Sequence, residues 1–202
     1  MVEANALAAA IGARVKQERK TRHWTLDQLA EVAGVSRRMI VNVENGAANP
    51  SVNTLLRISD ALGIGLPALV EPPARSGVRV TRKDEGSTLW QGDHGGRGVL
   101  VAGTQKPDVL ELWDWTLNVG DTHVSEEHMA GTKELLQVLS GTAEIVVGDE
   151  AFRLTAGDAI TFSGDLPHSY TNVDQDTVRF VLAVFEPNVG SRENGAASAR
   201  HS

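Results

Sequence analysis

The apolar residues of this chain change their spacing once, and the change falls at a segment with two adjacent prolines. Over residues 1–70 apolar side chains recur at helical spacing, which predicts short α-helices. Over residues 78–187 the pattern becomes short β-type runs between Gly and Asp turns. Pro72 and Pro73 cannot continue a helix, so we expect residues 71–77 to form a stiff linker. The sequence therefore predicts an α+β protein of two domains.

The first domain is expected to be an all-α bundle of four to five helices. The second is expected to be an all-β sandwich or small double-sheet barrel, because many short strands at close spacing are typical of those folds. The predicted strands cover residues 78–80, 98–101, 109–117, 135–139, 143–147, 159–162 and 178–185. Residues 188–202 are small and polar, and we expect them to form a flexible tail.

The composition excludes several classes of protein. Of 202 residues, 41% are hydrophobic and 22% are charged, which is typical of a chain with a buried core rather than of a disordered or fibrous one. No apolar run approaches the roughly 18–20 residues that cross a bilayer, and the start lacks the basic region of a secretory signal. Zero cysteines exclude disulfides, thiolate zinc sites and cysteine nucleophiles. We expect a cytoplasmic protein without a membrane partner.

Charge divides between the two parts of the chain. The net charge is -7, but residues 1–70 hold eight Lys/Arg and six Asp/Glu, a net +2, which leaves -9 for residues 71–202. Basic charge favours nucleic acid and acidic charge disfavours it. The two domains are therefore expected to have different partners.

Residues 25–46 have the order helix, glycine turn, helix, which is the spacing of a helix-turn-helix. Thr25 with Gln28 predicts a capping box, and Ser36 is placed to cap the second helix. The core-facing stripe of that helix leaves long donor-rich side chains outside, and these can bind base edges and phosphates. The outward residues are Arg37, Arg38, Val41 and Asn42. From periodicity alone, a helical bundle with a merely solvated charged face remains an alternative.

The block over residues 8–68 resembles the lambda-repressor-like, XRE-family DNA-binding domain. The matching motifs are Leu29-Ala30, Ala33-Gly34-Val35-Ser36, Ile40, Val43-Glu44-Asn45-Gly46 and Asn49-Pro50-Ser51. The resemblance implies that a homodimer binds double-stranded DNA at a palindromic operator. One departure is Leu26, since many members carry there a glutamine that touches phosphate. DNA contacts are implied for Thr25, Gln28, Ser36, Arg37, Arg38, Val41 and Asn42, and base reading for Arg37, Arg38 and Asn42.

Histidines and carboxylates cluster in the β-rich part of the chain. His128, Glu134 and His168 are two histidines and one carboxylate, a set that can hold one divalent transition metal such as Zn, Fe, Mn or Ni. From spacing alone this signal is weak. A hydrogen-bonded polar cluster, in a barrel that binds an organic ligand directly, is the alternative.

Residues 108–186 resemble the paired motifs of the cupin superfamily, a small double-sheet barrel. The matching residues are His128, Glu134 and Gly141 in the first motif and Gly157, His168 and Asn172 in the second. Ala130 replaces a second family histidine, and Ser163 and Asp165 replace a proline and a glycine. The resemblance implies a cupin fold with a ligand set reduced to three, for which His123 is a candidate fourth member.

Aromatic residues of the barrel are candidates for the wall of an effector pocket. They are Trp113, Trp115, Phe162 and Tyr170. Each also fits a plain core position, because the alternation over residues 109–117 does not tell which face of that strand points inward.

A helix-turn-helix head joined to a cupin body resembles a class of bacterial one-component transcription regulators in which the barrel dimerises and senses a small molecule. We therefore expect a sequence-specific transcriptional regulator without catalytic residues. One alternative is a metal-dependent cupin enzyme, a dioxygenase or isomerase, that carries a DNA-binding head. Another is an antitoxin-like DNA binder, which leaves the barrel without a role. Hydrolase, nucleotide triphosphatase and zinc-protease motifs do not occur.

Overall fold

The computed structural model describes residues 2–47, 50–71 and 78–190. Within these ranges the chain divides into two compact units, one that contains the five helices and one that contains the ten strands. Most of the predicted linker and tail, residues 72–77 and 191–202, lies outside the described residues.

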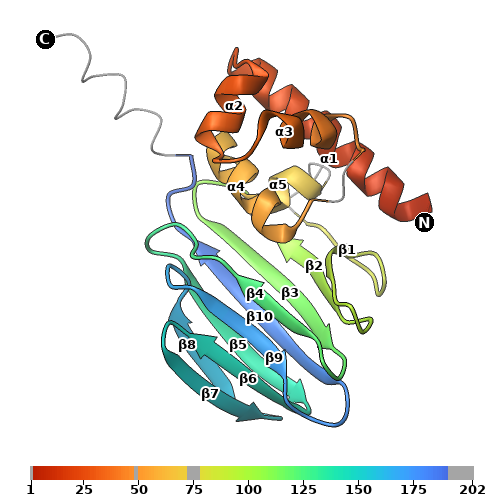
Figure 1. Cartoon of the computed structure of the whole chain (residues 1–202), viewed down its shortest axis with the longest axis vertical. Coiled ribbons are helices and arrows are strands. Elements are labelled where there is room, and N and C mark those ends of the chain that lie inside the picture. The colour runs from red at the N-terminus through yellow and green to blue at the C-terminus, as the bar shows by residue number, and fades with distance from the viewer. Residues whose placement is uncertain (1, 48–49, 72–77, 191–202) are drawn as a thin grey trace, which may run out of the picture. The chain divides into compact units, whose positions relative to one another are not determined.

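The helical unit holds the helices labelled α1 to α5 in Figure 1, and short local signals set where they begin and end. Ser51 caps one helix through its side-chain oxygen, which accepts from the Thr54 N–H. That helix ends at Gly63, whose φ of 59° is the left-handed conformation that glycine adopts without strain. The helices are α1 (Val2–Thr21), α2 (Leu26–Val32), α3 (Arg37–Glu44), α4 (Val52–Leu62) and α5 (Leu66–Val70).

The core of the helical unit is apolar and closely packed. Its fully buried side chains include Val15, Leu29, Ile40 and Ile58, one from each of the first four helices. Helices α1 and α3 approach so closely that a Cβ on Gly12 would lie 2.3 Å from the Val43 carbonyl oxygen. This tight approach fixes the orientation of α3 against α1.

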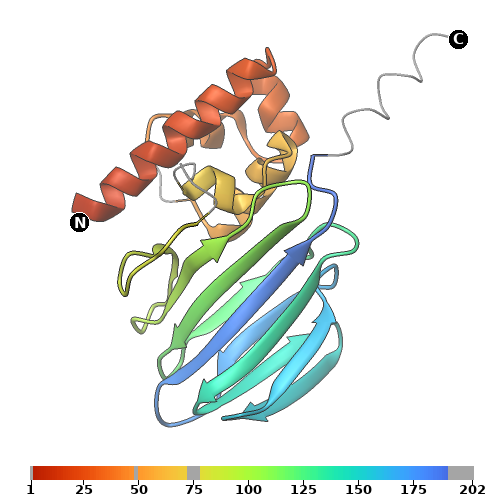
Figure 2. The same cartoon turned by 180° about the vertical axis from the view of Figure 1, so that it is seen from behind.

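The strand unit consists of two antiparallel sheets that are not joined into one closed barrel. The six-stranded sheet has the order β1-β2-β3-β10-β5-β8, and the four-stranded sheet has the order β4-β9-β6-β7. In Figure 2 the blue β10 lies between the green β3 and the teal β5. The strands are β1 (Ser87–Gln91), β2 (Arg97–Gly103), β3 (Val109–Leu117), β4 (Thr122–Ser125), β5 (Lys133–Ser140), β6 (Thr142–Val147), β7 (Glu150–Thr155), β8 (Ala159–Ser163), β9 (His168–Asn172) and β10 (Val178–Glu186).

Six of the predicted strands are confirmed, and one is wrong. Residues 78–80 form no strand, because β propensity alone does not make a strand outside a sheet and this segment belongs to neither of the two sheets. The sequence did not predict β1, β4, β7 or β9, which are short and carry many polar residues.

Burial along β3 decides which of its faces points inward. Val109, Trp113 and Trp115 are buried, whereas Leu110 and Leu112 are 45% and 44% exposed. The alternation on β10 is the same, since Val178 and Phe180 are buried on either side of the exposed Arg179. The aromatic residues of β3 therefore lie inside the sandwich. Among the described residues, no helix is long and apolar enough to cross a membrane.

Candidate functional site

Helices α2 and α3 are connected by a short turn, and each begins with a side-chain cap. The Thr25 hydroxyl oxygen accepts from the Gln28 N–H (3.2 Å), and the Thr25 N–H donates to the Gln28 side-chain oxygen (2.8 Å). This is the predicted capping box, and it is confirmed. The Ser36 hydroxyl oxygen accepts from the Met39 N–H (3.1 Å), which confirms the second cap. Thr25, Gln28 and Ser36 all remain exposed.

Helix α3 separates its apolar and polar residues. Ile40 and Val43 are buried in the helical core, and Arg37 and Arg38 are exposed. Val41 and Asn42 are half-buried. A positive, donor-rich surface of this kind at the start of a helix suits both phosphate and base edges.

One ion pair connects an outward residue of α3, Arg37, to α2. The Arg37 Nε lies 3.2 Å from the Asp27 Oδ1 of α2, with the two side chains 59% and 75% exposed. Solvent screens such a pair, so it is worth about 1 kcal/mol or less. Arg37 can therefore exchange this partner for another anion at little cost.

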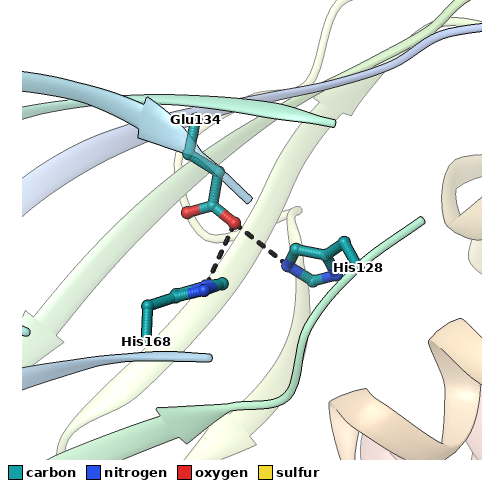
Figure 3. Close-up of side chains that lie close together, drawn as sticks. All are labelled: His128, Glu134 and His168. Carbon is teal, nitrogen blue, oxygen red and sulfur yellow. Dashed lines mark ion pairs between the residues drawn. The ribbon is translucent and has the colours of Figure 1, made fainter. Parts of the chain in front are cut away.

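The strand unit brings His128, Glu134 and His168 together, as Figure 3 shows. Glu134 lies on β5 and His168 on β9, while His128 lies in the segment between β4 and β5. Each histidine turns its Nε2 toward the Glu134 Oε1, at 3.0 Å for His128 and 3.1 Å for His168. One ligand atom from each residue lies within 4.8 Å of the other two. The structure thus places the three predicted ligand residues in one group.

Surrounding groups orient two of the three residues. The His168 Nδ1 lies 2.7 Å from the Leu166 carbonyl oxygen, which can only accept, so Nδ1 carries a proton; in the neutral imidazole the Nε2 lone pair then points at the group. The Tyr170 hydroxyl donates to the Glu134 Oε2 and leaves Oε1 to face the histidines. Hydrogen bonds of this kind are what metal ligands use to hold a fixed orientation.

Electrostatics favours an ionised carboxylate at the centre of the group. Burial raises the pKa of Glu134, but the two imidazoles outweigh burial and bring the pKa to about 2. Burial lowers the pKa of His168, whereas Glu134 and the Leu166 carbonyl raise it by more, so the pKa lies above its ordinary value. Burial, with the charge of Glu134, raises the pKa of Tyr170.

The donor set fits a divalent transition metal. Glu134 Oε1 and His168 Nε2 are buried, and neither has an aligned hydrogen-bond partner among the described residues, although they lie close together. Buried polar atoms that converge without bonding one another are the arrangement a metal ion would satisfy. Two imidazole nitrogens and one carboxylate oxygen suit Zn, Fe, Mn or Ni.

His123 does not belong to this group. It lies on β4 among aromatic rings, with ring centroids 4.7 Å from Trp115 and 5.4 Å from Trp90. The idea that it replaces the ligand lost at Ala130 is therefore wrong. Ala130 itself is exposed.

The four predicted pocket residues lie in or beside one row of rings. Trp113, Trp115 and Tyr170 are buried, and Phe162 is half-buried with its ring edge toward His168 (5.2 Å). Tyr170 lies 5.6 Å from the His168 ring and 5.9 Å from the Trp115 ring. The row therefore borders the histidine and glutamate group.

The sequence did not predict Trp90 or a place for His123 beside these residues. Trp90 contacts Trp115 at a centroid distance of 5.3 Å. No local pattern signals this contact, because β1 is joined to β3 only through β2. The burial of His123 is also invisible locally, since β4 is too short to establish an alternation.

Comparisons with known proteins agree with this geometry. The helix-turn-helix family model matches residues 15–69, and the cupin domain model matches residues 113–185. The HTH-type transcriptional regulator SinR of Bacillus licheniformis is 38% identical over 106 residues, which cover 52% of this chain and 90% of that protein. The chain belongs to the XRE-type helix-turn-helix transcriptional regulators. This XRE-type regulator carries a cupin domain, so both predicted resemblances are confirmed.

Similarity extends over both domains in other proteins. The HTH-type transcriptional regulator SutR of Escherichia coli (strain K12) is 26% identical over 182 residues, 90% of this chain and 97% of that protein. A crystal structure of an HTH_3 family transcriptional regulator from Vibrio cholerae has a TM-score of 0.72 at 24% identity, over 91% of this chain and 99% of that chain. At that identity the second match supports the fold alone. The XRE-type regulator is thus a DNA-binding transcriptional regulator with a helix-turn-helix and a cupin domain.

Proposed function

We propose that this XRE-type regulator binds a palindromic operator as a homodimer and that its cupin domain responds to a small effector at a metal held by His128, Glu134 and His168. The observation that carries the proposal is that two Nε2 atoms and one Oε1 atom converge within 4.8 Å. Two of these atoms, Glu134 Oε1 and His168 Nε2, are buried and lack an aligned hydrogen-bond partner among the described residues. An effector acts on DNA binding only if its affinity differs between the DNA-competent and DNA-incompetent states of the dimer.

Helix α3 is the element expected to enter the major groove. Support comes from the exposed Arg37 and Arg38, the half-buried Asn42 and the caps that hold the helix start in place. The guanidinium groups suit guanine or phosphate, and the Asn42 amide suits adenine. Two such helices in a dimer would read half-sites about 34 Å apart.

The outer face of the six-stranded sheet supports dimerisation. Leu110, Leu112, Leu135 and Leu139 are 44–48% exposed. Ala183 of β10 pairs with both Leu112 and Leu135, which places these leucines in one row across three strands. Contiguous exposed apolar surface of this kind is typical of protein interfaces. Sedimentation of the full chain is expected to give a dimer that Leu112→Glu with Leu135→Glu dissociates, whereas Val124→Glu on the other sheet does not.

Elemental analysis of protein purified without chelator tests the metal. We expect about one transition metal per protomer, lost in His168→Ala and retained in the control His94→Ala, whose histidine is exposed. A metal-free wild-type protein would contradict the metal site and favour a sandwich that binds an organic effector directly.

A second candidate function is a metal-dependent oxygenase or isomerase activity. The observation in its favour is the ligand set itself, because two histidines and one carboxylate with open positions also occur in non-haem iron oxygenases. Turnover separates the two functions, since a sensor returns its effector unchanged and an enzyme does not. Mass spectrometry of the bound molecule after incubation with metal-loaded protein and air distinguishes them.

A further inference from the structure

Two tryptophans on the inner face of β3 differ in their hydrogen bonding. The Trp113 Nε1–H donates to the Glu111 Oε2 at 2.9 Å. The Trp115 Nε1 is buried, and none of the described residues accepts from it. Trp115 as a whole is 2% exposed. Since leaving a buried donor unpaired is costly, Trp115 calls for an acceptor that the described residues do not supply.

His123 is a second unpartnered polar group at the same place. Its side chain comes from β4 of the opposite sheet, it is 7% exposed, and its ring centroid lies 4.7 Å from that of Trp115. Within the described part of the chain its ring contacts are aromatic, with Trp90, Trp115 and Tyr170, and its nitrogens have no hydrogen-bond partner. A neutral imidazole offers one donor and one acceptor.

The surroundings keep this pair uncharged. Burial, helped by the charges of His168 and His128 and opposed by Glu134, lowers the pKa of His123 to about 4. An ionised ligand group placed here would lose its hydration, and the uncharged indole and imidazole would offer it no counter-charge of their own, which is costly. Aromatic rings alone can attract a cation, but a cation with N–H donors would meet the donor of Trp115. The chemistry favours a neutral acceptor.

Tyr170 connects the pair to the histidine and glutamate group. Its ring lies nearly parallel to His123 (9°, centroids 6.0 Å apart) and 5.6 Å from His168. Its hydroxyl donates to Glu134. A molecule bound at Trp115 and His123 would therefore lie beside the candidate metal site.

We propose that Trp115 and His123 form a subsite that binds a neutral hydrogen-bond-accepting group, a carbonyl or amide, of the effector. The Trp115 N–H donates to the ligand oxygen, His123 supplies a second hydrogen bond, and the rings of Trp90 and Tyr170 flank it. This inference rests on the proposed effector binding but does not require the metal.

Three molecules of equal size and different charge test the proposal: acetamide, acetate and acetamidinium. Each is titrated into the full-length protein labelled with ¹⁵N-tryptophan, and the Trp115 indole N–H signal is assigned with Trp115→Phe. We expect acetamide to shift the Trp115 signal with saturation and to leave the Trp113 signal in place. Acetate and acetamidinium are expected to bind at least about tenfold more weakly. His123→Phe should weaken the binding of acetamide by about tenfold, whereas Trp113→Phe should bind acetamide as the wild type does.

A Trp115 signal that does not respond to acetamide would overturn the proposal, and so would equal binding of all three molecules. The wild-type titration decides the matter even if one variant fails to fold. Titrations with and without a chelator test acetamide binding at the subsite independently of metal binding. Acetamide binding by metal-free protein supports the subsite even where elemental analysis contradicts the metal, and loss of binding in both samples overturns the subsite while leaving the metal intact.

Discussion

The two domains build their sites in opposite ways. In the helical domain the outward residues lie on one short helix, from Arg37 to Asn42, and Arg37 is exposed. In the cupin domain Glu134 and His168 come from different sheets and are buried. The first site exposes positive charge, as the proposed contact with DNA requires, whereas the second buries polar atoms, as the proposed metal site requires. The difference means that the proposed DNA-binding surface needs only a correctly held helix, while the proposed effector site needs two sheets in register.

The largest effect is expected where α1 and α3 touch. In Gly12→Ala the new methyl group would lie 2.3 Å from the Val43 carbonyl oxygen, and backbone on both sides cannot move aside easily. We expect the helical domain to lose about 3 kcal/mol or more of stability, with loss of operator binding. Circular dichroism during urea unfolding measures the stability, and a gel-shift titration measures operator binding.

Gly148→Ala is the matched control in the cupin domain, because a Cβ there meets nothing within 4 Å and only the positive φ is strained. This variant should lose about 1 kcal/mol of unfolding free energy. Metal content should be unchanged in Gly12→Ala. If metal is lost together with DNA binding, the two domains do not behave as separate units and the comparison fails.

Arg37→Ala or Asn42→Ala tests whether α3 reads bases. Each variant is expected to lose about 1–3 kcal/mol of binding free energy on the selected operator and less on random DNA, because a base contact discriminates between sequences. Fluorescence anisotropy titrations at one fixed salt concentration give both affinities. Arg97→Ala, an exposed arginine on β2 of the cupin domain, is the control and should change neither. An unchanged operator affinity in both α3 variants would place the reading surface elsewhere.

Tyr170→Phe tests whether the Tyr170 hydroxyl orients Glu134 for metal binding. The variant removes the hydroxyl that donates to Glu134 Oε2, so the carboxylate loses its orientation. We expect metal affinity to fall by about 10–100-fold with the fold retained. Competition with a chromophoric chelator measures the affinity, and thermal unfolding checks the fold. Thr161→Val on β8 is exposed and serves as control. An equal loss in both variants would mean that Tyr170 acts only through stability.

The smallest expected effect is the pH dependence caused by His123. Its pKa is about 4 in the folded protein against an ordinary value of 6.5, so between these two pH values the unfolded chain binds the extra proton. Stability from this group is thus complete above pH 6.5 and falls as the pH drops toward 4. Between pH 7 and 5 the loss amounts to about 2 kcal/mol.

Urea unfolding of wild type and His123→Phe at both pH values isolates this contribution. The raised pKa of His168 acts in the opposite sense, but it is common to both proteins and cancels in the difference. If the variant loses as much stability on acidification as wild type, His123 is not held neutral by its surroundings.

The sequence determined the features that depend on near neighbours in the chain. Thr25 and Ser36 cap their helices because their side chains reach N–H groups three residues ahead, and such contacts form whatever the rest of the fold does. The helix-turn-helix and the long alternating strands β3 and β10 were predictable for the same reason. The identities of His128, Glu134 and His168 were also predictable, through their resemblance to the cupin motifs.

Tertiary structure decided everything that depends on pairing between distant segments. β9 (His168–Asn172) has no apolar alternation because its buried residues His168, Tyr170 and Asn172 carry polar atoms, and it forms a strand through its ladders to β4 and β6. Residues 78–80 have strong β propensity but belong to neither sheet, so they stay irregular. The inner face of β3 and the unpaired N–H of Trp115 likewise follow only from the packing of two sheets. Burial and hydrogen-bond satisfaction are properties of residues brought together in space, which local sequence does not record.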